Sequence, residues 1–227
     1  MKPHSQQFLT ELVQRYPILR EVQNRIADAV MSIRDVFIAG GTLFLCGNGG
    51  SAADAEHIAG ELLKGFLETR RIPDAQRETF VQRCGHKDGA YLARHLQMGL
   101  RAIALTGHPA MATAMINDLD GELVFAQQLF ALARPGDALL GISTSGNARN
   151  VELAALTGKA CGVKIIALTG RDGGRLKKIA DIAICVPADT VHETQELHLP
   201  VYHTVCAMLE SDLFSRDEDA PVMADGT

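Results

Sequence analysis

The residue types best suited to chemistry begin with His57 and Glu61, which lie four residues apart just after a glycine-rich stretch. If this segment is helical, that spacing places both side chains on one face of the helix. Such a pair could coordinate a metal ion, transfer protons as an acid and a base, or form an ordinary solvated contact. The spacing alone leaves these three interpretations open.

A second group of polar candidates interrupts the last apolar segment, where Gln195, Glu196, His198 and His203 stand among leucines and valines. Histidine and carboxylate are ordinary zinc ligands, whereas glutamine is a poorer one. We expect this segment to be helical, but sequence spacing does not show whether it meets the helix of His57. A shared site is therefore a hypothesis at this point.

The glycine-rich stretch Gly47–Ser51 follows an apolar run, 42–46, and precedes an Ala-, Glu- and Leu-rich segment, 52–63. A strand, a glycine turn and a helix together form a common phosphate site, because glycine lets the backbone approach the anion and the first helical N–H groups point at it. Ser51 occupies an N-cap position and could also donate to phosphate. The stretch lacks the lysine of a nucleotide P-loop and the dinucleotide spacing, so ATP and NAD are not expected. A glycine turn without a ligand is the alternative.

A hydroxyl-rich loop, Ser143–Asn147, follows a second apolar run at 138–142. Hydroxyls beside a buried strand are costly to leave unpaired, but together they can surround one phosphate with donors. A helix cap rich in serine and threonine is the simpler alternative. Neutral donors of this kind favour a sugar monophosphate over a metal-bound nucleotide.

Five short apolar runs alternate with helical segments, which predicts an α/β fold with a five-stranded parallel sheet and helices on both faces. In such sheets ligands bind at the carboxyl ends of the strands. The loops Gly47–Ser51, Ser143–Asn147 and Thr169–Gly174 each follow a strand and should therefore lie on one rim. The five expected strands are 42–46, 101–106, 138–142, 164–168 and 182–186.

The remaining segments flank this domain, which we place at 41–214. Residues 1–40 predict two amphipathic helices that pack either on the sheet or in a bundle between subunits. Residues 67–99 are rich in arginine, glutamate and aspartate and predict a polar insertion after the first crossover helix. The acidic tail, 215–227, is expected to be disordered.

The composition excludes several classes of function. A net charge of −5 gives no basic footprint for nucleic acid, and 5% aromatic residues without tryptophan argue against a stacking surface for single strands. No apolar run is long enough to span a bilayer, and no signal peptide is visible. The five cysteines are scattered without a C-x-x-C pair, which favours reduced thiols in a cytoplasmic protein.

Four stretches together resemble the sugar isomerase (SIS) domain, and within it the phosphoheptose isomerases. These enzymes convert sedoheptulose 7-phosphate to glycero-manno-heptose 7-phosphate. The resemblance extends over about 20–214 apart from 67–99. The four stretches are Gly47–His57, Gly141–Asn147, Ala167–Gly174 and Gln195–His198.

The resemblance implies a homotetramer with shared active sites, a phosphorylated sugar as substrate, and one Zn²⁺ per site. It also implies aldose–ketose isomerisation by proton transfer through an enediol, in which zinc could polarise the oxygens. The implied roles are general base for Glu61, general acid for His203, zinc ligands for His57, Glu61, Gln195 and His203, and phosphate or sugar contacts for Asn48, Gly49, Gly50, Ser51, Asp118, Ser143, Thr144, Ser145, Asn147 and Gln195.

The chain departs from the family pattern in ways that bear on the substrate. Leu63-Lys64-Gly65 replaces the usual Thr-Gly-Arg, and Lys64 lacks the bidentate geometry of arginine. His192-Glu193 stands where the family often has Asp-Arg, and Pro200 removes one helix N–H between Gln195 and His203.

Two further readings of the chain stay open. A related bacterial replication-initiation regulator keeps the fold but lacks the glutamate and the last histidine, so Glu61 and His203 favour an enzyme over a sugar-phosphate-sensing or protein-binding regulator. A purely structural oligomer with empty loops is the third reading.

Overall fold

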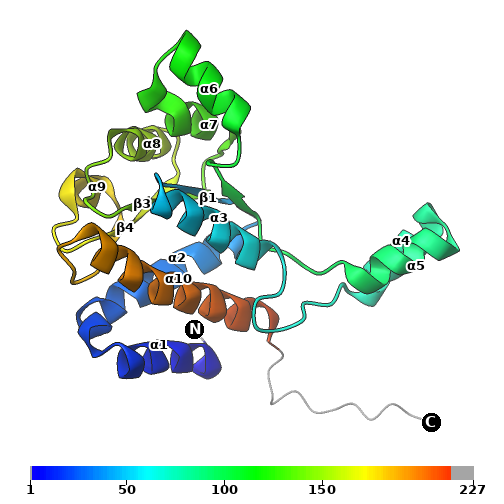
Figure 1. Ribbon diagram of the computed structural model, residues 1–227. Helices are drawn as coiled ribbons and strands as arrows, with labels where there is room; N and C mark the ends of the chain where they lie inside the picture. Colours follow the sequence, from blue (N-terminus) through cyan, green and yellow to red (C-terminus); the bar gives the residue numbers. More distant parts are fainter. Residues whose placement is uncertain (1, 216–227) are drawn as a thin grey trace.

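The computed structural model describes residues 2–215, so the tail expected to be disordered lies almost entirely outside the described residues. Its centre is a five-stranded parallel sheet in the order β2-β1-β3-β4-β5 (Figure 1). The predicted α/β fold and all five strands are confirmed. The strands are β1 (Leu43–Cys46), β2 (Ala102–Ala104), β3 (Ala138–Ser143), β4 (Lys164–Thr169) and β5 (Ile182–Cys185).

The register places the ligand-type loops on one rim, as expected. Cys46 pairs with Gly141, and Ser143 pairs with Thr169, so strands β1, β3 and β4 end beside one another. The loops after these strands therefore meet at the carboxyl edge of the sheet.

Alternation along each strand divides the core into two layers. Leu43 and Leu45 face one layer, while Phe44 and Cys46 face the other, since successive side chains point to opposite sides of a strand. The first layer packs against α1 (Pro3–Arg15), α2 (Gln23–Ile38), α3 (Gly50–Leu63) and α10 (Val191–Phe214). The second packs against α6 (Pro109–Asp118), α7 (Val124–Leu132), α8 (Arg149–Ala160) and α9 (Gly174–Ile179).

Two proline positions show how local chemistry shapes these helices. The segment that begins at Pro17 forms a 3₁₀ helix, η1 (Pro17–Val22), before α2 begins, so the long N-terminal helix is divided. A second short 3₁₀ helix, η2 (Gly121–Leu123), precedes α7. Pro200 lies inside α10, which nevertheless runs without interruption, and the Thr204 hydroxyl donates to the Pro200 carbonyl at 2.8 Å. The residues of α10 on either side of Pro200 therefore belong to one continuous helix.

The insertion after α3 forms a helical hairpin, which we call the arm. It consists of α4 (Asp74–Cys84) and α5 (His86–His95), which pack on each other and project away from the body (Figure 1). No helix among residues 2–215 is long and apolar enough to cross a membrane.

Candidate functional site

The first part of the site is the glycine turn between β1 and α3. Gly49 has φ 56° and ψ −122°, a backbone conformation that side chains disfavour, and α3 begins at the next residue. At Gly47 a side chain would collide with the Ser51 backbone. The sequence therefore uses glycine where the turn requires it, and it leaves the N-terminus of a four-turn helix facing the rim.

Hydroxyl groups without internal partners surround this turn. Ser51 and Ser143 are buried, and within residues 2–215 the hydroxyls of Ser51, Ser143 and Thr144 donate no hydrogen bond to the chain. Free donors beside a helix N-terminus are the arrangement that binds a phosphate dianion. We call Ser51, Ser143 and Thr144, together with the N-terminus of α3, the hydroxyl end of the site.

The rest of the Ser143–Asn147 loop is fixed by hydrogen bonds of its own. The Asn147 amide nitrogen donates to the Ser145 carbonyl at 2.8 Å, and the Asn147 side-chain oxygen accepts from the Arg175 backbone at 3.1 Å. Gly146, with φ 64°, lies so close to Gly173 that no side chain would fit. Asn147 thus holds two rim loops together.

Three other predicted contact residues lie in different surroundings. Asn48 exchanges two side-chain hydrogen bonds with Asn150, at 2.8 and 2.9 Å, on the hydroxyl end. Gln195 packs its amide against Gly50 at the start of α3. Asp118 is exposed at the end of α6 and accepts a hydrogen bond from the neighbouring Asn117, so no described contact joins it to the other candidates.

The second part of the site lies on the later turns of α3, where α10 crosses it. His57 Nε2 is 3.3 Å from Glu61 Oε1, and the rings of His57 and His203 lie 5.0 Å apart between centroids, nearly perpendicular. The tertiary structure therefore brings together the two helices whose meeting the sequence left open. We call this group the ionic end of the site.

His203 is neutral and poorly solvated. Its Nε2 is buried without a hydrogen-bond partner among the described residues. Burial lowers the pKa of His203, His57 lowers it further, and Glu61 opposes the effect. The ring also packs against Phe66, with centroids 5.5 Å apart. An unpaired buried imidazole nitrogen costs stability unless a ligand occupies it.

Glu61 is paired on both carboxylate oxygens. His57 contacts Oε1, and the Lys64 ammonium lies 2.7 Å from Oε2. Partial burial alone would raise the pKa of Glu61, but Lys64 and then His57 lower it below its ordinary value. Glu61 is therefore a carboxylate at neutral pH and available to accept a proton.

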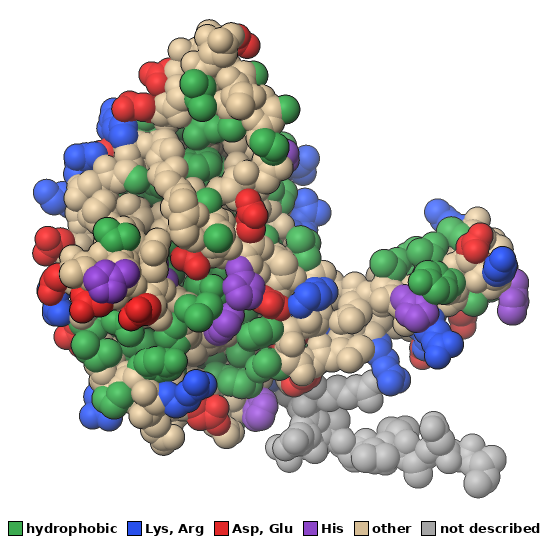
Figure 2. Space-filling model, viewed as in Figure 1, with side chains coloured by type: hydrophobic (Ala, Val, Ile, Leu, Met, Phe, Trp, Pro, Cys, Tyr) green, Lys and Arg blue, Asp and Glu red, His purple; other side chains and the backbone are tan. Residues whose placement is uncertain are grey.

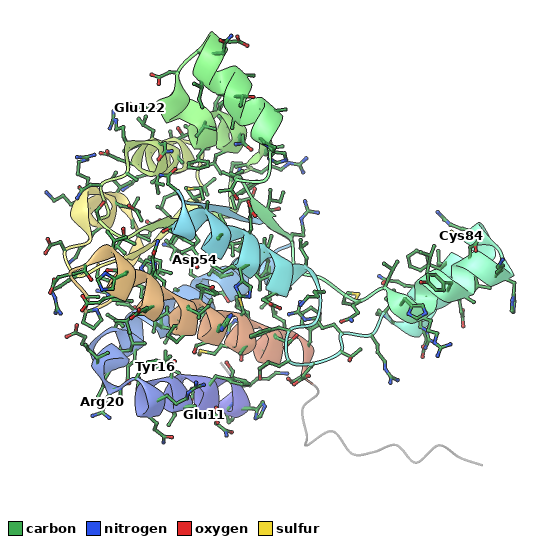
Figure 3. All side chains as sticks on the ribbon, viewed as in Figure 1. Glu11, Tyr16, Arg20, Asp54, Cys84 and Glu122 are labelled. Carbon is green, nitrogen blue, oxygen red and sulfur yellow. The ribbon has the colours of Figure 1, made fainter. Side chains whose placement is uncertain are left out.

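Tyr202 supports this cluster from α10. Its hydroxyl is 3.0 Å from His57 Nδ1, which fixes the orientation of that ring and leaves Nε2 for Glu61 or a ligand. Burial, with the Asp54 and Glu61 carboxylates, raises the pKa of Tyr202 above its ordinary value. Asp54 lies on α3 facing α10 (Figure 3), and burial raises the pKa of its carboxyl.

A buried ion pair holds the chain directly after Glu61. The Arg70 guanidinium is 2.7 Å from Glu210 Oε1 and donates to the Leu62 carbonyl at 2.7 Å and the Glu61 carbonyl at 3.3 Å. Glu210 also accepts from the backbone N–H groups of 66, 67 and 68. We call this pair the latch, because it joins the end of α3 to α10.

A cavity of about 360 Å³ opens beside His203, between α1 and α10. Its lining includes Phe8, Arg15, Tyr16 and Phe66, and Figure 3 shows Tyr16 at the end of α1. The volume lies in the range of small-molecule sites. Substrate-sized space therefore adjoins the ionic end.

Whether the site fits a zinc ion depends on the types and arrangement of its side-chain donor atoms. In residues 2–215, no group of three or more His, Cys, Asp or Glu side chains is arranged to hold a metal ion. The donor types nevertheless suit zinc, and the buried, unpaired Nε2 of His203 is an atom that a metal would satisfy. Of the four ligands implied by resemblance, His57, Glu61 and His203 lie together, while Gln195 lies near Gly50.

Sequence reasoning missed four supporting residues. Asp54 lies one turn before His57, and Tyr202 lies one turn after His198, so helical spacing on the two candidate segments was the available signal. Arg70 and Glu210 had weaker signals, since Glu210 stands out only as an acidic residue, with Asp212, at the end of an apolar segment.

The model of the SIS domain family matches residues 7–91 and 89–170. A phosphoheptose isomerase of Akkermansia muciniphila is 34% identical over 203 residues, which cover 89% of this chain and 93% of the relative. One of Geotalea daltonii is 39% identical over 195 residues, covering 86% and 88%. The family model therefore extends over the hydroxyl end and the α3 part of the ionic end, and it ends before α10.

Solved structures agree with this result. The phosphoheptose isomerase of Neisseria gonorrhoeae superposes with a TM-score of 0.70 at 31% identity, covering 89% of this chain and 94% of its own. That of Francisella tularensis gives a TM-score of 0.71 at 28% identity, covering 91% and 96%.

Proposed function

This chain is an isomerase of the SIS domain family, and from that premise we propose that it interconverts the ketose and aldose forms of a phosphorylated sugar. Sedoheptulose 7-phosphate is the candidate substrate that the similar isomerases suggest. The observation that carries the proposal is that an ionised Glu61 and a neutral His203 both contact the ring of His57, with a substrate-sized cavity beside His203.

In the proposed mechanism, the hydroxyl end binds the phosphate, and the Glu61 carboxylate removes the proton from C1 of the ketose. The electron pair forms the C1–C2 double bond of an enediol. His203 gives a proton to the oxygen on C2 and accepts one from the oxygen on C1, while Glu61 returns its proton to C2. Both side chains end as they began, and only the carbonyl position has changed. General acid–base assistance of this kind accelerates a reaction roughly 10²–10⁴-fold.

Zinc is a further part of the proposal. His57, Glu61 and His203 would hold the ion, and Gln195 would join them after moving from Gly50. When bound, zinc would supply a Lewis acid for the sugar oxygens. Tyr202 would then keep the His57 ring oriented through Nδ1.

We also propose a cytoplasmic homotetramer with active sites shared between subunits, as the resemblance implies. Large apolar side chains on α6, directly after it and on α7 support an assembly: Ile116, Leu119 and Phe130 are 67%, 69% and 67% exposed. Exposed apolar side chains of this size mark contact surfaces when they gather on one face. Light scattering at several protein concentrations would give the mass of the assembly.

The test is turnover with sedoheptulose 7-phosphate and with six- and five-carbon ketose phosphates, followed by the appearance of the aldose. We expect Glu61→Gln and His203→Gln to reduce kcat about 10²–10⁴-fold, while Glu56→Gln, an exposed residue of the same helix, leaves it unchanged. No turnover of any of these sugars by the wild-type chain would overturn the proposal. Retained phosphate binding in that case would favour a sugar-phosphate sensor.

A further inference from the structure

The base of the arm contains a cavity of about 390 Å³, separate from the site described above. The segments that lead into and out of the arm meet there in a short antiparallel contact. In it, Arg71 pairs with Gln97, and the Met98 N–H donates to the Arg70 carbonyl at 2.8 Å. The arm leads into the amino end of β2, whereas the hydroxyl end lies at the carboxyl ends of β1 and β3. The two places are therefore at opposite edges of the sheet.

The lining of this cavity is strongly cationic. Arg71, Arg77, Arg94 and His95 face it, and no aspartate or glutamate is among its lining residues. Figure 2 shows basic and histidine side chains, with some acidic ones among them, along the lower side of the arm. The remaining lining residues are Thr69, Ile72, Ala93, Leu96 and Gln97.

Two of these arginines have no counter-ion. Within residues 2–215, Arg71 and Arg94 form no ion pair, and Arg77 contacts only Asp74, at 3.2 Å. Several other cations of the chain have carboxylate partners, as Arg25 has Asp28, and what distinguishes Arg71 and Arg94 is that they line one cavity without such a partner. Gathering unpaired guanidinium groups around one concave space is unfavourable unless an anion enters it.

We propose that this cavity, the arm-base site, binds the phosphate group of a phosphomonoester or inorganic phosphate. Guanidinium groups bind phosphate oxygens in a bidentate manner, and two or three of them around one cavity match a dianion. The His95 ring is held against Tyr91, with centroids 4.4 Å apart, and the Thr69 hydroxyl adds a neutral donor.

The arm-base site adjoins the latch along the chain. Arg71 follows Arg70, whose guanidinium contacts the carbonyl oxygens of Glu61 and Leu62 and the carboxylate of Glu210. A bound phosphate can come from two sources, the substrate of a neighbouring copy or a separate phosphorylated compound. The chemistry of recognition is the same for both.

The experiment is calorimetric titration of the full chain with inorganic phosphate, in a Ser143→Ala/Thr144→Val background that weakens the hydroxyl end. We expect one phosphate per chain to remain bound, and Arg71→Gln/Arg94→Gln to weaken it at least tenfold. Arg83→Gln/Lys87→Gln removes two charges from the same arm away from the cavity and serves as the control. Equal binding by all variants, or equal loss in the control, would overturn the proposal.

Kinetics with the wild-type hydroxyl end distinguishes the two sources. If the phosphate belongs to the substrate, Arg71→Gln/Arg94→Gln raises KM for the ketose phosphate with little change in kcat. If a separate anion binds, KM stays constant while the calorimetric loss persists. Because Arg71 and Arg94 are exposed, thermal unfolding of these variants should match that of the wild type.

Discussion

The two ends of helix α3 differ in their chemistry. At its start, neutral hydroxyls and backbone N–H groups face the rim, and the turn is fixed by glycine conformation and by amide contacts. At its far end, Glu61, Lys64, Arg70 and Glu210 form ion pairs, the last two fully buried. Substitution at the hydroxyl end should therefore affect binding, whereas substitution at the ionic end should affect folding and proton transfer together.

The largest effect should come from the latch. Glu210→Gln leaves the Arg70 guanidinium buried without a countercharge, which costs about 3–5 kcal/mol of unfolding free energy. Urea unfolding measures the loss, with Glu196→Gln, exposed on the same helix, as the control that should change by less than about 0.5 kcal/mol. Equal stability of the two variants would show that the latch contributes nothing.

His198, between the two ends on α10, should make stability depend on pH. Neither buried ring nitrogen has a hydrogen-bond partner of good geometry among the described residues, and burial lowers the pKa of His198 to about 4 against a smaller opposing effect of the Thr169 backbone. The unfolded chain binds this proton near pH 6.5, so stability is present above that pH and is lost as the pH falls toward 4, by roughly 3 kcal/mol. His198→Leu should flatten this part of the curve; an unchanged slope would contradict the assignment.

At the hydroxyl end the effect should be on binding. Thr144→Val removes a donor without changing the shape of the side chain, and a lost hydrogen bond to a charged group costs about 1.5–3 kcal/mol. KM for the sugar phosphate should rise at least about tenfold with little change in kcat. Thr144→Ser keeps the hydroxyl and should restore KM; failure of this rescue would point to packing instead.

The smallest effect should come from Lys64. Because Lys64 lowers the pKa of Glu61, Lys64→Met should move the acid limb of the kcat/KM profile to higher pH. The Lys64 side chain is 59% exposed, and exposed pairs contribute only about 0.2–1 kcal/mol, so the shift should stay below about one pH unit. A shift to lower pH would contradict the role given to Lys64.

The comparison also shows what sequence could predict. Parallel strands share a carboxyl edge, so the meeting of the Gly47–Ser51 and Ser143–Asn147 loops followed from local pattern alone. Helical spacing placed His57 with Glu61. The approach of His203 to His57 came only through resemblance, because it joins segments far apart in the chain.

Other features depended on side-chain geometry that no spacing encodes. The position of Gln195 against Gly50 and the latch between Arg70 and Glu210 are each set by how α10 lies across α3. The sequence likewise marked the insertion as polar without indicating that it folds into a projecting hairpin.

The latch has a practical consequence for protein engineering. Because Arg70 and the contact between Arg71 and Gln97 hold the two segments that join the arm to the body, the turn at Gly85 is separated from Glu61. A foreign peptide spliced in at that turn, next to the exposed Cys84, should be displayed far from the ionic end of the site without altering its geometry (Figure 3).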